Sequence, residues 1–130
     1  MAATTLPLSS APNTRAGGVV TLVIGLQTDD VEIMRMFEAG LKECRENGVD
    51  YDTCLLNPTK PDELRRRLKD GLAHKKYDVI CVGFGLRGNR DFTPVFEVIM
   101  NEAVQAQSQA RFAFQGWPNE ILASIRRVVD

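Results

Sequence analysis

The chain has 130 residues, 44% of them apolar and 25% charged, which is typical of one soluble globular domain with a single core. Its 16 basic and 17 acidic residues give a formal net charge of −1, so bulk charge favours binding neither to nucleic acid nor to an anionic membrane. The most apolar stretch, residues 19–26, is far shorter than the roughly 20 residues that cross a bilayer, which argues against a membrane span.

Residues 1–18 (MAATTLPLSSAPNTRAGG) predict a disordered tail, because this small and polar stretch buries too little apolar surface to offset the entropy of ordering. An organelle transit peptide is the alternative, since acidic residues are absent there. Residues 19–130 are then expected to form a single domain.

The three cysteines, Cys44, Cys54 and Cys81, lie far apart and show no C-x-x-C spacing. This spacing argues against a disulfide framework and against a tetrahedral zinc site. A reducing compartment fits best, so we expect a cytoplasmic protein. Cys81 falls within a predicted strand and is expected to be buried and inert.

The first half of the domain predicts two strands, each followed by a helix. Residues 19–26 (VVTLVIGL) are almost all apolar and rich in β-branched side chains, as in a strand covered on both faces. From Val31, apolar residues recur every three or four positions up to Gly48, which indicates an amphipathic helix closed by a glycine. Residues 51–56 (YDTCLL) predict a second strand, and leucines at every fourth position from 64 to 72 predict the next helix.

The second half repeats this pattern. Residues 78–84 (DVICVGF) predict a third strand, and a helix follows that is capped by Thr93 and has Pro94 in its first turn. Residues 111–115 (RFAFQ) predict a fourth strand, after which Asn119 caps the last helix.

Strands and helices therefore alternate strictly. Alternation at this spacing predicts four parallel strands joined by right-handed helical crossovers, which is an open three-layer α/β sandwich with four helices. The flavodoxin-like strand order 2-1-3-4 is favoured because it puts the two most apolar strands, the first and the third, in the middle.

In such a sheet, ligands bind at the edge where the strands end. The longest loop on this edge follows the third strand. Gly83, Gly85 and Gly88 let the backbone turn tightly and approach a ligand, while Arg87 and Arg90 offer forked donors suited to phosphate or carboxylate. We therefore predict that a small anionic ligand binds there. The alternative is that both arginines are ordinary solvated loop residues.

The same glycines fit the dinucleotide-binding spacing G-x-G-x-x-G, as GFGLRG at residues 83–88. They follow the third strand rather than the first. The acid expected about 20 residues later has no counterpart at a strand end, because Glu102 falls within a helix. We therefore assign no cofactor.

Asp29 and Asp30 are the candidates for catalysis, as a general base or as magnesium ligands. The spacing of Asp29 and Glu32 instead resembles a helix capping box, and Asp30 then lies in the first turn, where negative charge is favoured. We therefore predict no metal site.

Four further residues complete the predicted ligand-binding set. Gln27 and Thr28 follow the first strand and Asn57 follows the second, where each can hydrogen-bond a ligand but is also ordinary in a turn. Trp117, the single tryptophan, follows the fourth strand and either forms an aromatic wall over a planar ligand or seals the core.

Two segments, YDVICVGFGLRGNRDFTPVFEVIMNEAV (residues 77–104) and ARFAFQGWPNE (residues 110–120), resemble a family of short, uncharacterised microbial α/β proteins with a flavodoxin-like or Rossmann-like fold. The resemblance covers nearly all of residues 19–130 and implies the fold but no activity. Flavodoxins resemble the chain in topology only, because LQTDDVE stands where they carry a phosphate-binding loop.

Two functions follow as expectations. The first is binding of an anionic small metabolite at the sheet edge, by a small enzyme or by a ligand-binding domain derived from one. The second is a non-catalytic interaction or regulatory module that forms a homodimer through an edge strand. Phe112 and Phe114 leave the fourth strand with little charge to blunt its edge.

Overall fold

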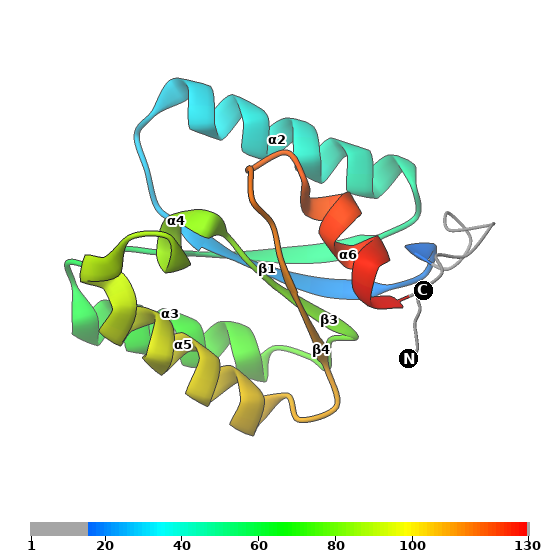
Figure 1. Ribbon diagram of the computed structural model, residues 1–130. Coiled ribbons are helices and arrows are strands. Elements are labelled where there is room, and N and C mark those ends of the chain that lie inside the picture. Colours follow the sequence, from blue (N-terminus) through cyan, green and yellow to red (C-terminus); the bar gives the residue numbers. More distant parts are fainter. Residues whose placement is uncertain (1–15, 130) are drawn as a thin grey trace.

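The computed structural model describes residues 16–129 and contains one sheet of four strands (Figure 1). The strands are β1 (Val20–Leu26), β2 (Asp50–Leu56), β3 (Val79–Val82) and β4 (Arg111–Phe114). Their order is β2-β1-β3-β4, and each neighbouring pair is parallel. The predicted α/β fold and its strand order are therefore confirmed.

Helices cover both faces of this sheet and complete the three layers. Helices α2 (Val31–Glu46) and α6 (Ile121–Val129) lie on one face, and α3 (Pro61–Ala73) and α5 (Thr93–Ala106) lie on the other (Figure 1). Parallel neighbours require a crossover that returns the chain to the same end of the sheet, and the helices supply it. All four strands therefore end at the same edge.

Strand side chains alternate between two cores. Even-numbered residues, such as Leu22 and Ile80, pack into the core shared with α3 and α5. Odd-numbered residues, such as Val23 and Cys81, pack into the core shared with α2 and α6. Burial on both faces explains why β1 and β3 are nearly continuous apolar runs. The alternation of side chains also determines on which side of the sheet each residue at a strand end lies.

The segment after β3 is more helical than predicted. Strand β3 ends two residues early, at Val82, because the chain turns at Gly83 into the short helix α4 (Phe84–Arg87). A 3₁₀ helix, η1 (Arg90–Phe92), follows where the sequence predicts a loop. The residues described thus form five α-helices rather than four.

Helix α5 begins without the predicted hydroxyl cap. Thr93 is its first residue, and the Thr93 hydroxyl donates to the carbonyl of Arg90 at 2.8 Å. Phe92 occupies the cap position, because η1 directly precedes the helix and the chain is already helical there. The prediction that Thr93 caps this helix is therefore wrong.

The predicted tail, residues 1–18, lies mostly outside the described residues. At its end, Ala16 is buried in the core, and the backbone amide of Gly18 donates to the carbonyl of Gly48 at 2.9 Å. Among residues 16–129, every helix is too short or too polar to cross a membrane.

A buried glutamine joins three segments at the opposite end of the sheet. Gln107, at the end of α5, is 3% exposed. Its side-chain amide donates to the carbonyls of Leu72 at 2.7 Å and Lys75 at 2.8 Å. Its oxygen accepts from the backbone amide of Tyr77 at 3.0 Å. One side chain thus satisfies the backbone of the α3–β3 connection, which would otherwise be buried and unpaired.

Candidate functional site

A row of four residues crosses the sheet where the strands end. Gly25 of β1 pairs with Leu55 of β2, and Gly83 and Gln115, the residues directly after β3 and β4, continue this row across the sheet. All four are odd-numbered and face α2 and α6. Glycines stand in the middle of the row, Gly25 within β1 and Gly83 directly after β3, so the middle of the row carries no side chain.

This row is the floor of a pocket of about 510 Å³. Helix α2 forms one wall, and α4 and the loop after β4 form the others. Its lining residues are mainly apolar: Gly25, Leu26, Thr28, Asp30, Ile33, Met34, Phe37, Leu55, Gly83, Phe84, Gly85, Gln115, Gly116, Trp117 and Pro118. The volume and the apolar lining with few polar groups are typical of small-molecule sites.

Gly83 is not required by the backbone. Its φ of −75° and ψ of 153° are extended values that any residue adopts. A Cβ at this position would come no closer than 3.6 Å to the Ile24 carbonyl oxygen and 3.7 Å to Nε2 of Gln115. Alanine would therefore fit, and it would take up space on the pocket floor. Glycine here keeps that space open.

The two later glycines are explained by packing within the chain. A Cβ at Gly85 would lie 3.2 Å from a methyl carbon of Leu26, and a Cβ at Gly88 would overlap the ring of Phe84. Neither has a positive φ. Gly85 lines the pocket and Gly88 does not. The close approach of backbone to ligand that the sequence predicts is therefore available at Gly83 rather than at Gly88.

Gln115 closes one end of the floor. Its side chain is 3% exposed and lines the pocket. Its Oε1 atom is buried and has no hydrogen-bond partner among residues 16–129. An unpaired buried acceptor costs about 1–3 kcal/mol, and most buried polar atoms are paired. Gln115 therefore holds an unused acceptor beside the bare floor.

Asp30 lines the pocket as the N-cap of α2. Its Oδ1 accepts from the backbone amides of Glu32 at 2.9 Å and Ile33 at 3.1 Å. The predicted capping box of Asp29 and Glu32 is therefore wrong by one residue, because the helix begins at Val31. Asp29 is exposed and lies outside the lining.

Thr28 also lines the pocket, and it fixes the turn before α2. Its hydroxyl oxygen accepts from the backbone amide of Asp30 at 3.1 Å. The hydroxyl hydrogen of Thr28 is left to donate to another group. Thr28 thus offers the pocket a donor in a fixed position.

Arg87 ends α4 and does not line the pocket, but it contacts the pocket residues Phe84 and Gln115. Its guanidinium stacks on the rings of Phe84, 5.0 Å from the ring centre, and Phe114, 5.5 Å from the ring centre. Its Nη2 donates to the carbonyl of Gln115 in a long hydrogen bond of 3.4 Å. Within residues 16–129 it has no carboxylate partner. Cation–π contacts therefore fix this charge next to the pocket residue Phe84, and next to Phe114 outside the pocket, without neutralising it.

Besides Arg87 and Gly88, three more of the predicted ligand-binding residues do not line the pocket. Gln27 is exposed, and the side chain of Asn57 accepts from the amide and hydroxyl of Thr59 within its own turn. Arg90 lies in η1, beyond the pocket wall. Trp117 does line the pocket, with 60% of its surface exposed, which is a wall position rather than a core position.

The pocket floor and the wall formed by α2 were not predicted from the sequence. The sequence predicts Gly25 and Gln115 within strands, and Met34 and Phe37 on the apolar stripe of a helix. Counting alternate residues from the buried start of each strand would have placed Gly25 and Gln115 on one side of the sheet. The α2 wall carried no such signal, because these side chains are apolar like any helix stripe.

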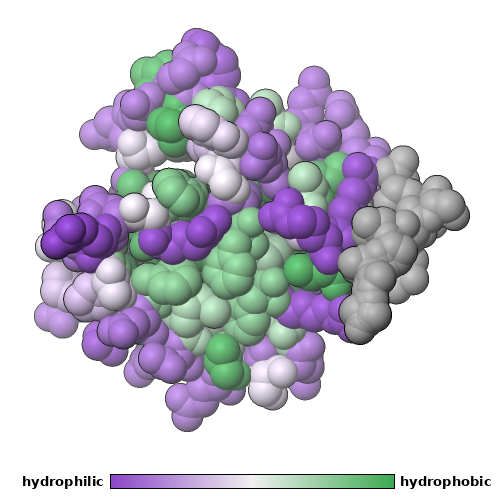
Figure 2. Space-filling model, viewed as in Figure 1, coloured by the Kyte–Doolittle hydropathy of each residue, from purple (hydrophilic) through white to green (hydrophobic). Residues whose placement is uncertain are grey.

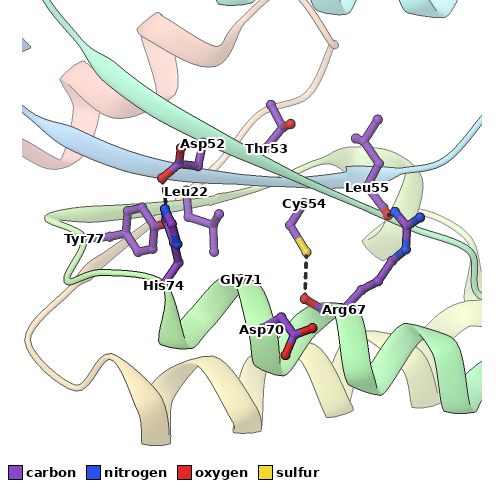
Figure 3. A pocket seen from close by; sticks show the side chains of 10 residues that line it. All are labelled: Leu22, Asp52, Thr53, Cys54, Leu55, Arg67, Asp70, Gly71, His74 and Tyr77. Carbon is purple, nitrogen blue, oxygen red and sulfur yellow. Dashed lines mark hydrogen bonds between the residues drawn. The ribbon is translucent and has the colours of Figure 1, made fainter.

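A second cavity, of about 600 Å³, lies between β2 and α3 (Figure 3). Asp52, Tyr77 and His74 gather at one of its ends and Arg67 lies at the other. The Tyr77 hydroxyl donates to Asp52 at 2.8 Å, and the Lys75 ammonium lies 3.2 Å from the same oxygen. Asp52, Tyr77 and Lys75 are thus paired with one another within the chain.

The pairing of Asp52 with Tyr77 shifts the pKa of both side chains. Burial tends to raise the pKa of Asp52, but the hydrogen bonds from Tyr77 and Lys75 outweigh it and hold that pKa below its ordinary value. Burial, and then the hydrogen bond to Asp52, raise the pKa of Tyr77. The carboxylate is thus charged and the phenol neutral at neutral pH.

The cysteines do not supply a nucleophile. Cys44, Cys54 and Cys81 are all buried, and burial raises the pKa of their thiols to about 12, 11 and 11. The expectation that Cys81 is buried is confirmed. No three metal-ligating side chains cluster in the part of the chain that the structure describes.

Comparison with models of known protein families finds no match to this chain, and comparison with curated proteins finds none either. Function must therefore be argued from the pocket. The pocket brings together an apolar wall, a bare backbone floor, an unpaired amide oxygen and a nearby cation. Its one carboxylate, on Asp30, already accepts two backbone amides, so the arrangement is suited to binding rather than to proton transfer.

Proposed function

We propose that this protein binds a small organic molecule in the pocket at the sheet edge, with a planar apolar body over the floor and an anionic group at Arg87. The observation that carries the proposal is Gly83, where the backbone tolerates a side chain and the chain has left the space empty. The resemblance to short microbial α/β proteins adds no activity to this proposal.

The lining supports a flat apolar body. The floor at Gly25 and Gly83 is peptide backbone, which is flat and admits close contact. Phe84 and Trp117 are 50% and 60% exposed, so large rings stand at the pocket mouth without covering one another. Burying such rings against a planar ligand contributes both apolar area and favourable ring contacts.

Arg87 supports the anionic group. Its charge is held in place by two rings and has no carboxylate partner within the described chain. Guanidinium groups bind carboxylate and phosphate through paired donors. A ligand whose anion reaches the rim would pair with this charge while its body lies over Gly83.

The test uses Trp117, the only tryptophan, as the reporter. Titration with naphthoate, a bicyclic aromatic carboxylate, is expected to change Trp117 fluorescence and to raise the midpoint of thermal unfolding, because a ligand that binds only the folded state stabilises it. Gly83→Ala should weaken binding at least tenfold by filling the floor. Gly71→Ala is the matched control, because Gly71 lines the other cavity.

The anionic contact has its own control. Arg87→Gln is expected to weaken naphthoate binding about tenfold and to leave the neutral naphthamide unchanged, since hydrogen bonds to charged groups contribute about 1.5–3 kcal/mol. Arg66→Gln removes an exposed arginine on α3 and should change neither affinity. Equal binding by the parent and by Gly83→Ala would rule out this pocket as the site.

A separate observation supports the second candidate function, a homodimer. Apolar side chains gather on the face formed by α5 and β4 (Figure 2). Val104 is 51% exposed, and Phe96, Phe112 and Phe114 are only partly buried. An exposed apolar area of this kind is typical of a contact between protein chains.

The proposed dimer would form through side chains rather than by extending the sheet. Arg127 donates to the Phe114 carbonyl at 2.7 Å, which occupies a backbone acceptor of the edge strand β4. Light scattering at several concentrations should show a dimer that Val104→Glu converts to a monomer. Gln105→Glu is the control, because it adds the same charge at the exposed residue next to Val104. A parent protein that stays monomeric throughout would exclude this candidate.

A further inference from the structure

Among the described residues that line the pocket, Gln115 carries a buried side-chain oxygen without a hydrogen-bond partner. Its Nε2 lies 3.7 Å from where a Cβ of Gly83 would stand. The amide nitrogen of Gln115 therefore borders the bare floor. A buried polar atom that is unpaired in the free protein is placed to be paired by something that enters the pocket.

A carboxamide presents a donor and an acceptor side by side. Its chemical complement is a ligand edge that carries a C=O next to an N–H, as in a lactam ring. The terminal torsion of glutamine is soft, so the amide of Gln115 can turn its oxygen from its buried position toward a ligand on the floor. Pairing both groups at once would satisfy the acceptor that the free protein leaves unpaired.

The surroundings restrict the ligand further. Gly25 and Gly83 leave the adjacent floor without side chains, so a ring can lie flat against the backbone with its edge directed at Gln115. The facing wall of α2, with Met34 and Phe37, is apolar. A polar chain or a sugar would leave its hydroxyls unpaired against this wall, whereas a planar ring would not.

Resting on the proposed function, we infer that the pocket selects planar mono- or bicyclic heterocycles with a lactam edge, and that Gln115 is the residue that determines this selectivity. Arg87 would bind an anionic substituent on the same ring. A site that hydrogen-bonds a polar ligand edge discriminates against an analogue that lacks it, because its own groups are then left unpaired.

The test compares two probes of matched shape and charge, a quinolinone carboxylate with a lactam edge and naphthoate without one, by titration of Trp117 fluorescence. The parent protein is expected to bind the quinolinone carboxylate about tenfold more tightly, as one satisfied hydrogen-bond pair predicts. Gln115→Met, which keeps the side-chain length, should remove this preference, so that the variant binds the two probes with affinities within about twofold of each other. Thermal unfolding of Gln115→Met verifies that the variant folds.

Each outcome has a distinct meaning. A lactam preference that disappears in Gln115→Met supports the inference. Equal affinity of the parent for both probes, or a preference that survives in Gln115→Met, overturns the role of Gln115 and leaves the proposed function intact. If neither probe changes fluorescence or thermal stability, both the inference and the proposed function are wrong.

Discussion

Gly40 of α2 lies against the backbone of Pro118, so closely that a Cβ at position 40 would stand 2.8 Å from the Pro118 carbonyl oxygen. This contact brings α2 up to the loop after β4, and both segments are walls of the pocket. Glycine is therefore needed at this point of the helix despite its poor helix propensity. The contact also distinguishes Gly40 from Gly71, another glycine within a helix, which the sequence alone does not set apart.

Gly40→Ala and Gly71→Ala should change stability in opposite directions. Both glycines lie within helices, where alanine is favoured by about 1 kcal/mol. At Gly71 the nearest atom to the new Cβ is Sγ of Cys54 at 3.4 Å, an ordinary contact, so this variant should be stabilised. At Gly40 the clash with backbone should cost about 1–3 kcal/mol and outweigh the propensity. Urea unfolding measures both, and stabilisation of Gly40→Ala would contradict the close approach.

Gly83→Ala should leave the fold intact or make it slightly more stable. Because the native φ and ψ suit alanine and the nearest atom would be 3.6 Å from its Cβ, the variant restricts the unfolded chain without straining the folded one. We expect a gain of about 0.5 kcal/mol in the free energy of unfolding. Loss of ligand binding together with unchanged or higher stability would separate a binding role for Gly83 from a folding role. A strongly destabilised variant would show that the glycine is structural.

Replacing Gln107 should be costly. Gln107→Leu would leave the amide of Tyr77 and the carbonyls of Leu72 and Lys75 without their partner, so we expect a loss of about 3 kcal/mol in the free energy of unfolding. Gln105→Leu, on the exposed side of the same helix, should stay within about 0.5 kcal/mol. Denaturant midpoints decide between these values. Similar small losses of unfolding free energy in both variants would mean that water takes over the hydrogen bonds made by Gln107.

Acid should remove part of the stability that Asp52 provides. Because the pKa of Asp52 is lower in the folded protein than in the unfolded chain, its contribution is present above the unfolded value of about 3.9. The contribution falls as the pH drops through the folded pKa, where Tyr77 and Lys75 lose their charged partner. The difference in urea midpoint between the parent and Asp52→Asn should therefore shrink between about pH 5 and pH 2.

Asp70→Asn is the control for this pH dependence. Asp70 lines the same cavity, but no described residue forms a hydrogen bond or ion pair with its side chain. The difference in urea midpoint between the parent and Asp70→Asn should therefore be small at every pH. If the difference in urea midpoint between the parent and Asp52→Asn stays constant with pH, the pairing of Asp52 adds no net stability.

The sequence predicted the sheet better than the site. Strand order followed from hydrophobicity, because β1 and β3 are buried on both faces and must lie in the middle. Thr28, Gly85 and Trp117 were predicted because loops after parallel strands meet at one edge. Arg87 was expected to face a ligand directly. Its stacking on Phe114 joins residues far apart in the chain, and no local spacing predicts that contact.

The pocket is assembled from stretches that begin at Gly25 and end at Pro118, nearly the full described domain. Its floor needs all four strands in register, and its walls need α2 and the last loop to be docked. A chain emerging from the ribosome would therefore have no site until its final strand has been added. Binding would then report that the chain has been made and folded as far as Pro118.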